Sequence, residues 1–193
     1  MRLGLFGGTF NPIHLGHLIL AECARAQYRL DQVWFIPTAV PPHKTTRDLL
    51  DGRQRLRLIR LAIRGHAAFR ACDVELAREG ASYTVDTVRA IHAARPSDRL
   101  FWLVGSDVLQ VRWRSAPELQ RRCTFLVAGR AFSASRRRGW RVQRIQMPQI
   151  DISSSMIRAR LRAGTSIRYV VPPAVERALL RQRFYRRPLR RTR

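Results

Sequence analysis

Short apolar runs alternate with longer amphipathic segments along most of the chain. The apolar runs are bounded by turn-forming or charged residues, which is typical of buried strands, and we expect strands over 2–6, 33–36, 69–74, 100–104, 124–128 and 142–146. In the other segments apolar residues recur with a helical period, which predicts helices over 14–28, 51–64, 83–94, 117–121, 154–163 and 172–184. This alternation predicts right-handed crossovers and an α/β fold, with a parallel sheet of about five or six strands flanked by helices.

The spacing of side chains also predicts how some helices are held. In the first predicted helix the apolar face is expected to contain Leu15, Leu18, Ile19 and Cys23. Burial of that face against the sheet would hold the helix in place. Ser82 precedes another predicted helix, and its hydroxyl group is expected to cap it.

Several predicted strands end at residues that suit close contact with a ligand. Gly7 and Gly8 follow the first strand, Pro37 follows the second, and Gly105 follows the fourth. In a parallel sheet these ends lie along one edge, which is where ligands bind in open α/β folds. We therefore expect the functional loops to gather at this edge.

The length and composition of the chain fit a single domain. A chain of 193 residues with 46% hydrophobic residues is large enough to bury a core, and we assign residues 1–185 to one domain and 186–193 to a basic tail. No apolar run approaches the roughly 18–20 residues that span a bilayer. The apolar start ends at Gly7-Gly8 and predicts a strand rather than a signal segment, so we expect a cytoplasmic protein without a membrane partner.

The basic charge of the chain is extreme. Lys and Arg together number 37 against 13 Asp and Glu, which gives a formal net charge of +24, and Lys44 is the only lysine. Such a surface can bind nucleic acid through counterion release. Apart from 136–138 and 181–193, however, the arginines are spread along the chain, which favours a general use of arginine in place of lysine. We therefore do not expect nucleic acid as the main partner, and Lys44 marks a position that needs a compact ammonium group.

The first candidate site is the segment from Gly7 to His17, which reads GGTFNPIHLGH. Its glycines let the backbone approach a ligand. His14 and His17 are three residues apart at the start of a helix and share a face, with Gly16 leaving room beside them. The free N–H groups and the dipole of the helix start suit a phosphate group. The alternatives are a turn with two surface histidines and a metal site, although His-x-x-His alone has no third metal ligand nearby.

Two further segments supply cations. The loop over 37–44 contains three prolines and ends in Lys44, so it holds an ammonium group that can neutralise charge on phosphoryl oxygens. The segment 151–158 reads DISSSMIR, in which serine hydroxyls and amides can cradle a phosphate and Arg158 can bind it bidentately. A proline-stiffened surface turn and an ordinary serine-capped helix are the respective alternatives.

Together these segments resemble the nucleotidyltransferase superfamily with the His-x-Gly-His signature, and within it the nicotinate-nucleotide adenylyltransferases. The resemblance covers nearly the whole chain, through separate motifs in the expected order, and includes 82–87 (SYTVDT) and 105–107 (GSD). It implies a Rossmann-like nucleotidyltransferase fold. It also implies that an acceptor phosphate attacks the α-phosphorus of ATP directly, with release of pyrophosphate and no covalent enzyme intermediate.

The resemblance also implies roles for individual residues. His14 and His17 would bind oxygens of the α-phosphate, while Lys44 and Arg158 would balance phosphate charge, and these four form the catalytic set. The implied ATP-binding set is Gly7, Gly8, Thr9, Phe10, Gly16, Gly105, Asp107, Ile152, Ser153 and Ser154. The implied acceptor-binding set is Tyr83, Thr84, Trp113 and Arg130. A Mg²⁺ ion is expected as cofactor, held mainly by substrate phosphates and water, because no dedicated metal-binding residues are visible.

The chain departs from the family pattern around the expected acceptor site. The stretch from Asp107 to Trp113 is shorter than expected, and Arg114 follows where an aromatic or polar residue is more common. Trp113 can either stack on the pyridine ring of the acceptor or pack against the fold. Arg130 matches a family arginine, but the residues that follow it, 131–132, are atypical.

The resemblance implies transfer of AMP from ATP to nicotinate mononucleotide, which gives nicotinate adenine dinucleotide (deamido-NAD) in NAD biosynthesis. Nicotinamide mononucleotide and phosphopantetheine are the alternative acceptors within the superfamily. A basic nucleic-acid-binding protein is the alternative from another class, and an inactive scaffold is disfavoured because all four catalytic positions are retained. The sequence leaves open whether the protein forms a homo-oligomer.

Overall fold

The computed structural model describes residues 1–40, 48–78, 80–105, 113–129, 140 and 142–185. Within them the chain forms a six-stranded sheet of parallel strands in the order β3-β2-β1-β4-β5-β6. The strands are β1 Arg2–Gly8, β2 Gln32–Pro37, β3 Phe69–Ala71, β4 Arg99–Gly105, β5 Cys123–Ala128 and β6 Val142–Ile145. The strand order reverses between β1 and β4, which opens a crevice at the carboxyl ends of these two strands.

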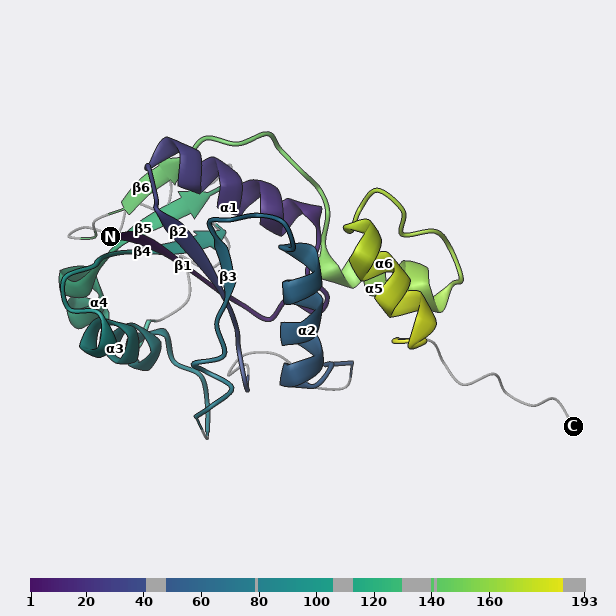
Figure 1. Ribbon diagram of the computed structural model, residues 1–193, viewed down its shortest axis with the longest axis horizontal. Helices are drawn as coiled ribbons and strands as arrows, with labels where there is room; N and C mark the ends of the chain where they lie inside the picture. Colours follow the sequence, from purple (N-terminus) through teal and green to yellow (C-terminus); the bar gives the residue numbers. More distant parts are fainter. Residues whose placement is uncertain (41–47, 79, 106–112, 130–139, 141, 186–193) are drawn as a thin grey trace, which may run out of the picture.

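Helices cover both faces of the sheet. They are α1 Leu15–Gln27, α2 Gly52–Ala62, α3 Thr84–Ala94, α4 Ala116–Arg122, α5 Ser154–Arg162 and α6 Pro173–Arg181. α1 lies along one face, whereas α3 and α4 lie together on the other (Figure 1). α5 and α6 follow the last strand and lie beside α2 at one end of the molecule (Figure 1). The predicted α/β class with a parallel sheet is confirmed.

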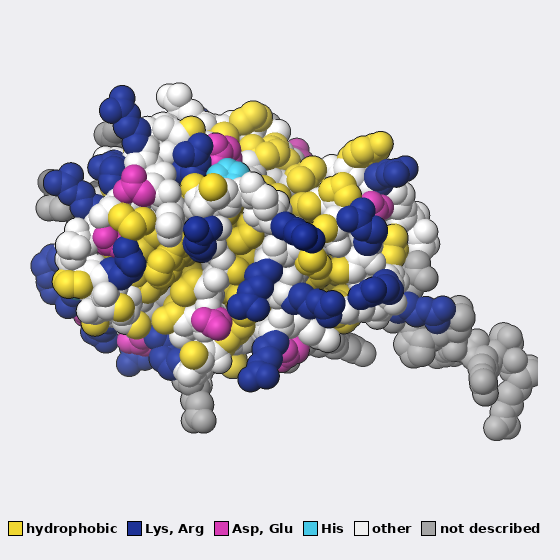
Figure 2. Space-filling model, viewed as in Figure 1, with side chains coloured by type: hydrophobic (Ala, Val, Ile, Leu, Met, Phe, Trp, Pro, Cys, Tyr) yellow, Lys and Arg dark blue, Asp and Glu magenta, His cyan; other side chains and the backbone are white. Residues whose placement is uncertain are grey.

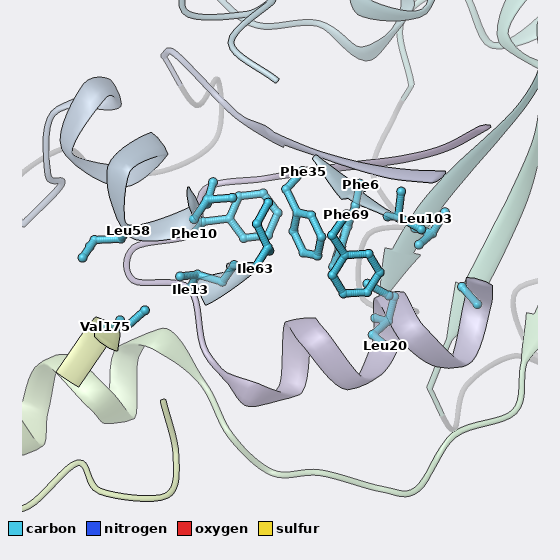
Figure 3. Packing of buried hydrophobic residues seen from close by; sticks show 14 of the residues in the cluster. Phe6, Phe10, Ile13, Leu20, Phe35, Leu58, Ile63, Phe69, Leu103 and Val175 are labelled. Atoms are coloured by element: carbon cyan, nitrogen blue, oxygen red, sulfur yellow. The ribbon is translucent and has the colours of Figure 1, made fainter. Parts of the chain in front are cut away.

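The sheet separates two hydrophobic cores, because successive side chains of a strand point to opposite faces. On β4, Phe101 and Leu103 join the core on the α1 side, whereas Trp102 and Val104 join the core on the α3–α4 side. The first core contains a row of aromatic rings, formed by Phe6, Phe10, Phe35 and Phe69 (Figure 3). The row extends beyond the end of β1, so it anchors the following loop to the core.

The face that α1 buries most deeply is only partly the one predicted, because Leu18 and Cys23 of the predicted face do pack against the core. Its buried residues are Leu20, Ala21 and Ala24, while the four predicted residues are only half-buried: Leu15, Leu18, Ile19 and Cys23. Ala21 and Ala24 are fully buried at 0% exposure. The spacing of the large apolar residues is an incomplete guide here because two small alanine side chains are buried more deeply than the predicted residues.

The predicted cap at Ser82 is also wrong. The helix α3 begins at Thr84, and Tyr83 takes the N-cap position without a side-chain hydrogen bond. The hydroxyl group of Ser82 instead accepts a hydrogen bond from the backbone N–H of Ala39, at 3.1 Å. Ser82 therefore joins the loop after β2 to the start of α3. A smaller difference concerns β3, which ends at Ala71 rather than extending to residue 74.

The surface carries the high positive charge of the chain. Lys and Arg side chains are scattered over the face shown in Figure 2, between hydrophobic and uncharged groups, rather than gathered into one patch. The basic clusters at 136–138 and 186–193 lie outside the described residues. Within the part of the chain that the structure describes, no helix is long and apolar enough to cross a membrane.

Candidate active site

A pocket of about 990 Å³ lies at the carboxyl edge of the sheet. Gly8 at the end of β1 pairs with Pro37 at the end of β2, and β4 ends beside them at Gly105. The predicted site residues that line the pocket are Gly7, Gly8, Thr9, Phe10, His14, Gly16, His17, Tyr83, Thr84, Gly105, Trp113, Ile152, Ser153, Ser154 and Arg158. The remaining three, Lys44, Asp107 and Arg130, lie outside the described residues. The expected gathering of loops at one edge is therefore observed.

The two histidines of the first motif form a close pair on the pocket wall. The centres of the His14 and His17 rings are 3.7 Å apart, and the rings are inclined by 31°. His14 takes the N-cap position of α1, and its backbone N–H donates to Nδ1 of His17 at 3.2 Å. Because Nδ1 is the acceptor, a neutral His17 carries its proton on Nε2. The turn thus fixes both the orientation and the tautomer of His17.

His14 is held neutral by burial. Its side chain is only 6% exposed, and the loss of hydration lowers its pKa from 6.5 to about 4. A Cβ atom on Gly16 would lie 3.1 Å from Nδ1 of His14, so glycine at this position seats the imidazole as well as leaving the pocket open. The ring nitrogen Nδ1 is buried and has no hydrogen-bond partner among the described residues.

The start of α5 closes the same side of the pocket. Ser153 caps the helix by accepting a hydrogen bond from the backbone N–H of Met156 at 3.1 Å. The hydroxyl group of Ser154 donates to the carbonyl oxygen of Pro12 at 2.9 Å. Arg158 lies one turn further and donates from Nη1 to the carbonyl oxygen of Asn11, also at 2.9 Å. These contacts attach α5 to the histidine loop, and we call this side of the pocket the α1–α5 end.

The opposite side of the pocket is built from aromatic residues on the second core, and we call it the α3–α4 end. It contains Tyr83 and Thr84 at the start of α3 and Trp113 just before α4. The Trp113 ring packs edge-on against Phe125 of β5, with 5.2 Å between ring centres. Trp113 therefore packs against the fold and also lines the pocket, so both of its predicted placements remain compatible with the structure.

The model of a family described as cytidylyltransferase-like matches residues 5–160. A protein of Shouchella clausii named "Probable nicotinate-nucleotide adenylyltransferase" is 42% identical over 186 residues, which cover 95% of this chain and 96% of the relative. A protein of the same name from Salinibacter ruber is 41% identical over 192 residues, covering 96% and 98% of the two chains. The chain belongs to the nicotinate-nucleotide adenylyltransferase family.

A solved structure of more distant sequence has the same fold. The Plasmodium falciparum nicotinic acid mononucleotide adenylyltransferase complexed with NaAD superposes with a TM-score of 0.79 at 18% identity, over 95% of this chain and 97% of that chain. The fold of this adenylyltransferase is therefore shared well beyond its relatives of higher sequence identity. The predicted Rossmann-like nucleotidyltransferase fold is confirmed.

Two residues of the first motif have packing roles that the sequence did not reveal. A Cβ atom on Gly7 would lie 2.5 Å from the Trp102 ring, so this glycine is required by the second core. The Phe10 ring is 2% exposed and meets the Phe6 ring edge to face at 5.3 Å. In the adenylyltransferase only the backbone of Gly7 and a small part of Phe10 can therefore face a ligand.

Arg55 is a structural residue of the site that sequence reasoning missed. Its side chain is fully buried, and its guanidinium donates to the carbonyl oxygens of Leu50 and Thr9, both at 2.8 Å, and of Thr38 at 2.7 Å. It thereby ties together the loops that follow β1 and β2 and the segment before α2. Its position in the sequence could have indicated its burial, because Arg55 lies four residues before Ile59 on the inward-facing stripe of an amphipathic helix.

Asn11 is a second such residue. Its Oδ1 accepts hydrogen bonds from the backbone N–H of Leu50, at 3.1 Å, and from the hydroxyl group of Tyr185. Its Nδ2 donates to the carbonyl oxygen of Asp48 at 2.8 Å. Asn11 thus connects the histidine loop to the segment before α2 and to the chain after α6. Burial raises the pKa of Tyr185, so its hydroxyl group stays a donor.

Glu75 is an acidic group on the wall of the same pocket. Its side chain is 4% exposed, and its Oε1 accepts a hydrogen bond from the hydroxyl group of Thr87 at 2.7 Å. Burial is the main cause that raises its pKa, although hydrogen bonds from Thr87 and Ser82 act in the opposite direction. Glu75 therefore braces the start of α3 from within the fold.

Proposed function

We propose that the chain transfers the AMP part of ATP to nicotinate mononucleotide, which yields nicotinate adenine dinucleotide and pyrophosphate in NAD biosynthesis. The observation that carries this proposal is that His14, His17 and Arg158 line one pocket at the strand ends of a nicotinate-nucleotide adenylyltransferase. A phosphate oxygen of the acceptor attacks the α-phosphorus of ATP. The bond from that phosphorus to the bridging oxygen breaks, and its electrons leave with pyrophosphate.

The α1–α5 end is proposed to hold the triphosphate. His17 would donate from Nε2 to an oxygen of the α-phosphate, since its Nδ1 already accepts from the backbone of His14. The neutral His14 ring packs beside His17, with 3.7 Å between the ring centres, and would contact the same α-phosphate. A guanidinium group has five N–H donors, so Arg158 can keep its contacts with Asn11 and Ser155 and still bind the β- and γ-phosphates. Lys44 would add a further positive charge.

The remaining ATP contacts are proposed at the strand ends and at the start of α5. Gly8, Thr9 and Gly16 leave backbone and space at the phosphates, and Ile152, Ser153 and Ser154 present a helix start with free amides. Gly105 and Asp107 would lie on the adenosine side, where a carboxylate can accept hydrogen bonds from ribose hydroxyl groups.

A magnesium ion is proposed to enter with ATP as part of the substrate. Among the described residues, no group of three or more His, Cys, Asp or Glu side chains is close enough to form a metal site. The proposal therefore keeps the ion on the phosphate oxygens and water, which is how Mg²⁺ is held in many nucleotide-dependent enzymes. When bound, it would neutralise charge on the leaving pyrophosphate.

The α3–α4 end is proposed to hold the acceptor nucleotide. Trp113 presents an aromatic surface that can stack on a pyridine ring, and the first amides of α3 at Thr84 suit a negatively charged group. Tyr83 completes this wall, and Arg130 would join it. We also propose that the enzyme works in the cytoplasm, where free small-molecule substrates are available to it.

The proposal is tested by a pyrophosphate-release assay with ATP and one acceptor at a time. The acceptors are nicotinate mononucleotide, nicotinamide mononucleotide and phosphopantetheine, each titrated to give kcat/KM. We expect the highest kcat/KM with nicotinate mononucleotide. A preference for phosphopantetheine, or no pyrophosphate release with any of the three, would overturn the proposed function.

A further inference from the structure

Arg114 is a charged residue on the pocket wall that the proposed reaction has not yet used. It follows Trp113 directly and lines the α3–α4 end of the pocket. The central carbon of its guanidinium lies 4.6 Å from the centre of the Tyr83 ring. This cation–π contact restrains the guanidinium beside the start of α3.

The acidic residues near Arg114 are already engaged. Glu118 of α4 accepts a hydrogen bond from Nε of Arg89 at 2.8 Å, and Asp86 of α3 accepts one from Nη1 of Arg89 at 3.1 Å. Glu75 is buried and accepts from a hydroxyl group. Among the described residues, no carboxylate lies within 4.0 Å of the Arg114 guanidinium. The pocket wall thus presents a positive charge without an anionic partner in this part of the chain.

The partner that fits this charge is a carboxylate on a flat ring. A guanidinium group binds a carboxylate through two parallel hydrogen bonds, whereas a neutral amide offers one acceptor oxygen and repels the guanidinium with its own N–H donors. The free amides at the start of α3 favour negative charge at the same end of the pocket. Trp113, the residue directly before Arg114, can stack on the ring that carries the carboxylate.

From this arrangement we infer that Arg114 binds the carboxylate of the nicotinate ring and selects it against the amide of the nicotinamide ring. The inference rests on the proposed function, since it names the residue by which that acceptor is chosen. Arg114 is exposed, so water and salt weaken its contact. We expect a selectivity contribution of about tenfold, in the range of a single charge-assisted hydrogen-bond pair at a partly open site.

The test is the ratio of kcat/KM for nicotinate mononucleotide to that for nicotinamide mononucleotide. It is measured in the wild-type protein, in Arg114→Gln and in Arg114→Lys. A ratio cancels any general loss of active enzyme, because both acceptors are turned over by the same preparation. We expect Arg114→Gln to lower the ratio by roughly tenfold, mainly through a higher KM for nicotinate mononucleotide, and Arg114→Lys to restore part of it.

The matched control is Arg121→Gln, which removes the same charge from an exposed position on α4 that does not line the pocket. It should leave the ratio at its wild-type value. A wild-type preference for nicotinate mononucleotide that survives in Arg114→Gln would overturn the role of Arg114 alone. A wild-type protein that lacks the preference would overturn the proposed acceptor itself, so the two failures are distinguishable.

Discussion

The two ends of the pocket are built by different means. At the α1–α5 end, hydrogen bonds with defined donors fix the groups: His14 to His17, Ser154 to Pro12 and Arg158 to Asn11. At the α3–α4 end, ring contacts dominate: Arg114 over Tyr83, and Trp113 against Phe125. Hydrogen bonds position a group to within a fraction of an ångström, as the chemistry at phosphorus requires, whereas flat surfaces tolerate small shifts of a bound ring.

This difference predicts a division of kinetic effects. Changes at the α1–α5 end should lower kcat, because they remove interactions that strengthen in the transition state. Changes at the α3–α4 end should raise KM for the acceptor and alter selectivity, because they remove interactions with a part of the substrate that does not react.

The largest effect is expected for His17→Ala. The substitution removes a donor whose tautomer is fixed by the backbone of His14, and kcat should fall by roughly 10²-fold or more. KM for nicotinate mononucleotide should change little. Steady-state kinetics with both substrates varied would measure this. His92→Ala on α3, which removes an imidazole that does not line the pocket, is the matched control and should keep kcat near the wild-type value. Near-normal kcat in His17→Ala would contradict the predicted division of kinetic effects between the two ends of the pocket.

A smaller effect is expected in the pH dependence of stability. Burial lowers the pKa of His14 in the folded protein from its ordinary value of 6.5 to about 4. Between these values the unfolded chain binds a proton at His14 that the folded protein does not, so the free energy of unfolding should fall as pH falls from about 6.5 to 4. The slope contributed by this one residue should approach about 1.4 kcal/mol per pH unit.

The comparison of wild type with His14→Asn isolates that slope. Chemical denaturation at a series of pH values gives the free energy of unfolding of each protein. Glu75 has a raised pKa and contributes with the opposite sign, but it is present in both proteins and cancels in the difference. Equal slopes in the two proteins between pH 6.5 and 4 would show that His14 is not held neutral by burial.

Much of the fold and of the α1–α5 end could be predicted from the sequence. Alternating apolar runs and amphipathic segments specify a parallel sheet, and glycines or prolines at strand ends mark its functional edge. His14 and His17 could be placed at this edge because they follow a strand end and share one face of a helix start that suits phosphate, whereas it was the resemblance to the family that placed Arg158 at the same triphosphate. These inferences depend on local rules that tertiary packing does not change.

What could not be predicted depends on contacts between distant segments. Ser82 lies where a helix cap is expected, yet its hydroxyl group accepts a hydrogen bond from the backbone N–H of Ala39, in the loop after β2. Arg55 is one arginine among many in the sequence, and only its burial among four backbone carbonyl oxygens distinguishes it. Gly7 is required by a tryptophan ring from β4 as much as by any ligand. Lys44 remains a prediction, since it lies outside the described residues.

The central claim is that the two imidazoles and Arg158 meet the triphosphate of one ATP molecule. The most direct test is a crystal structure of the protein with Mg²⁺ and α,β-methylene-ATP, which cannot be cleaved at the reacting position. The account predicts an α-phosphate oxygen at roughly 2.7–3.2 Å from Nε2 of His17, with the β- or γ-phosphate at a similar distance from the Arg158 guanidinium. A triphosphate bound in the pocket but out of reach of both side chains would contradict it.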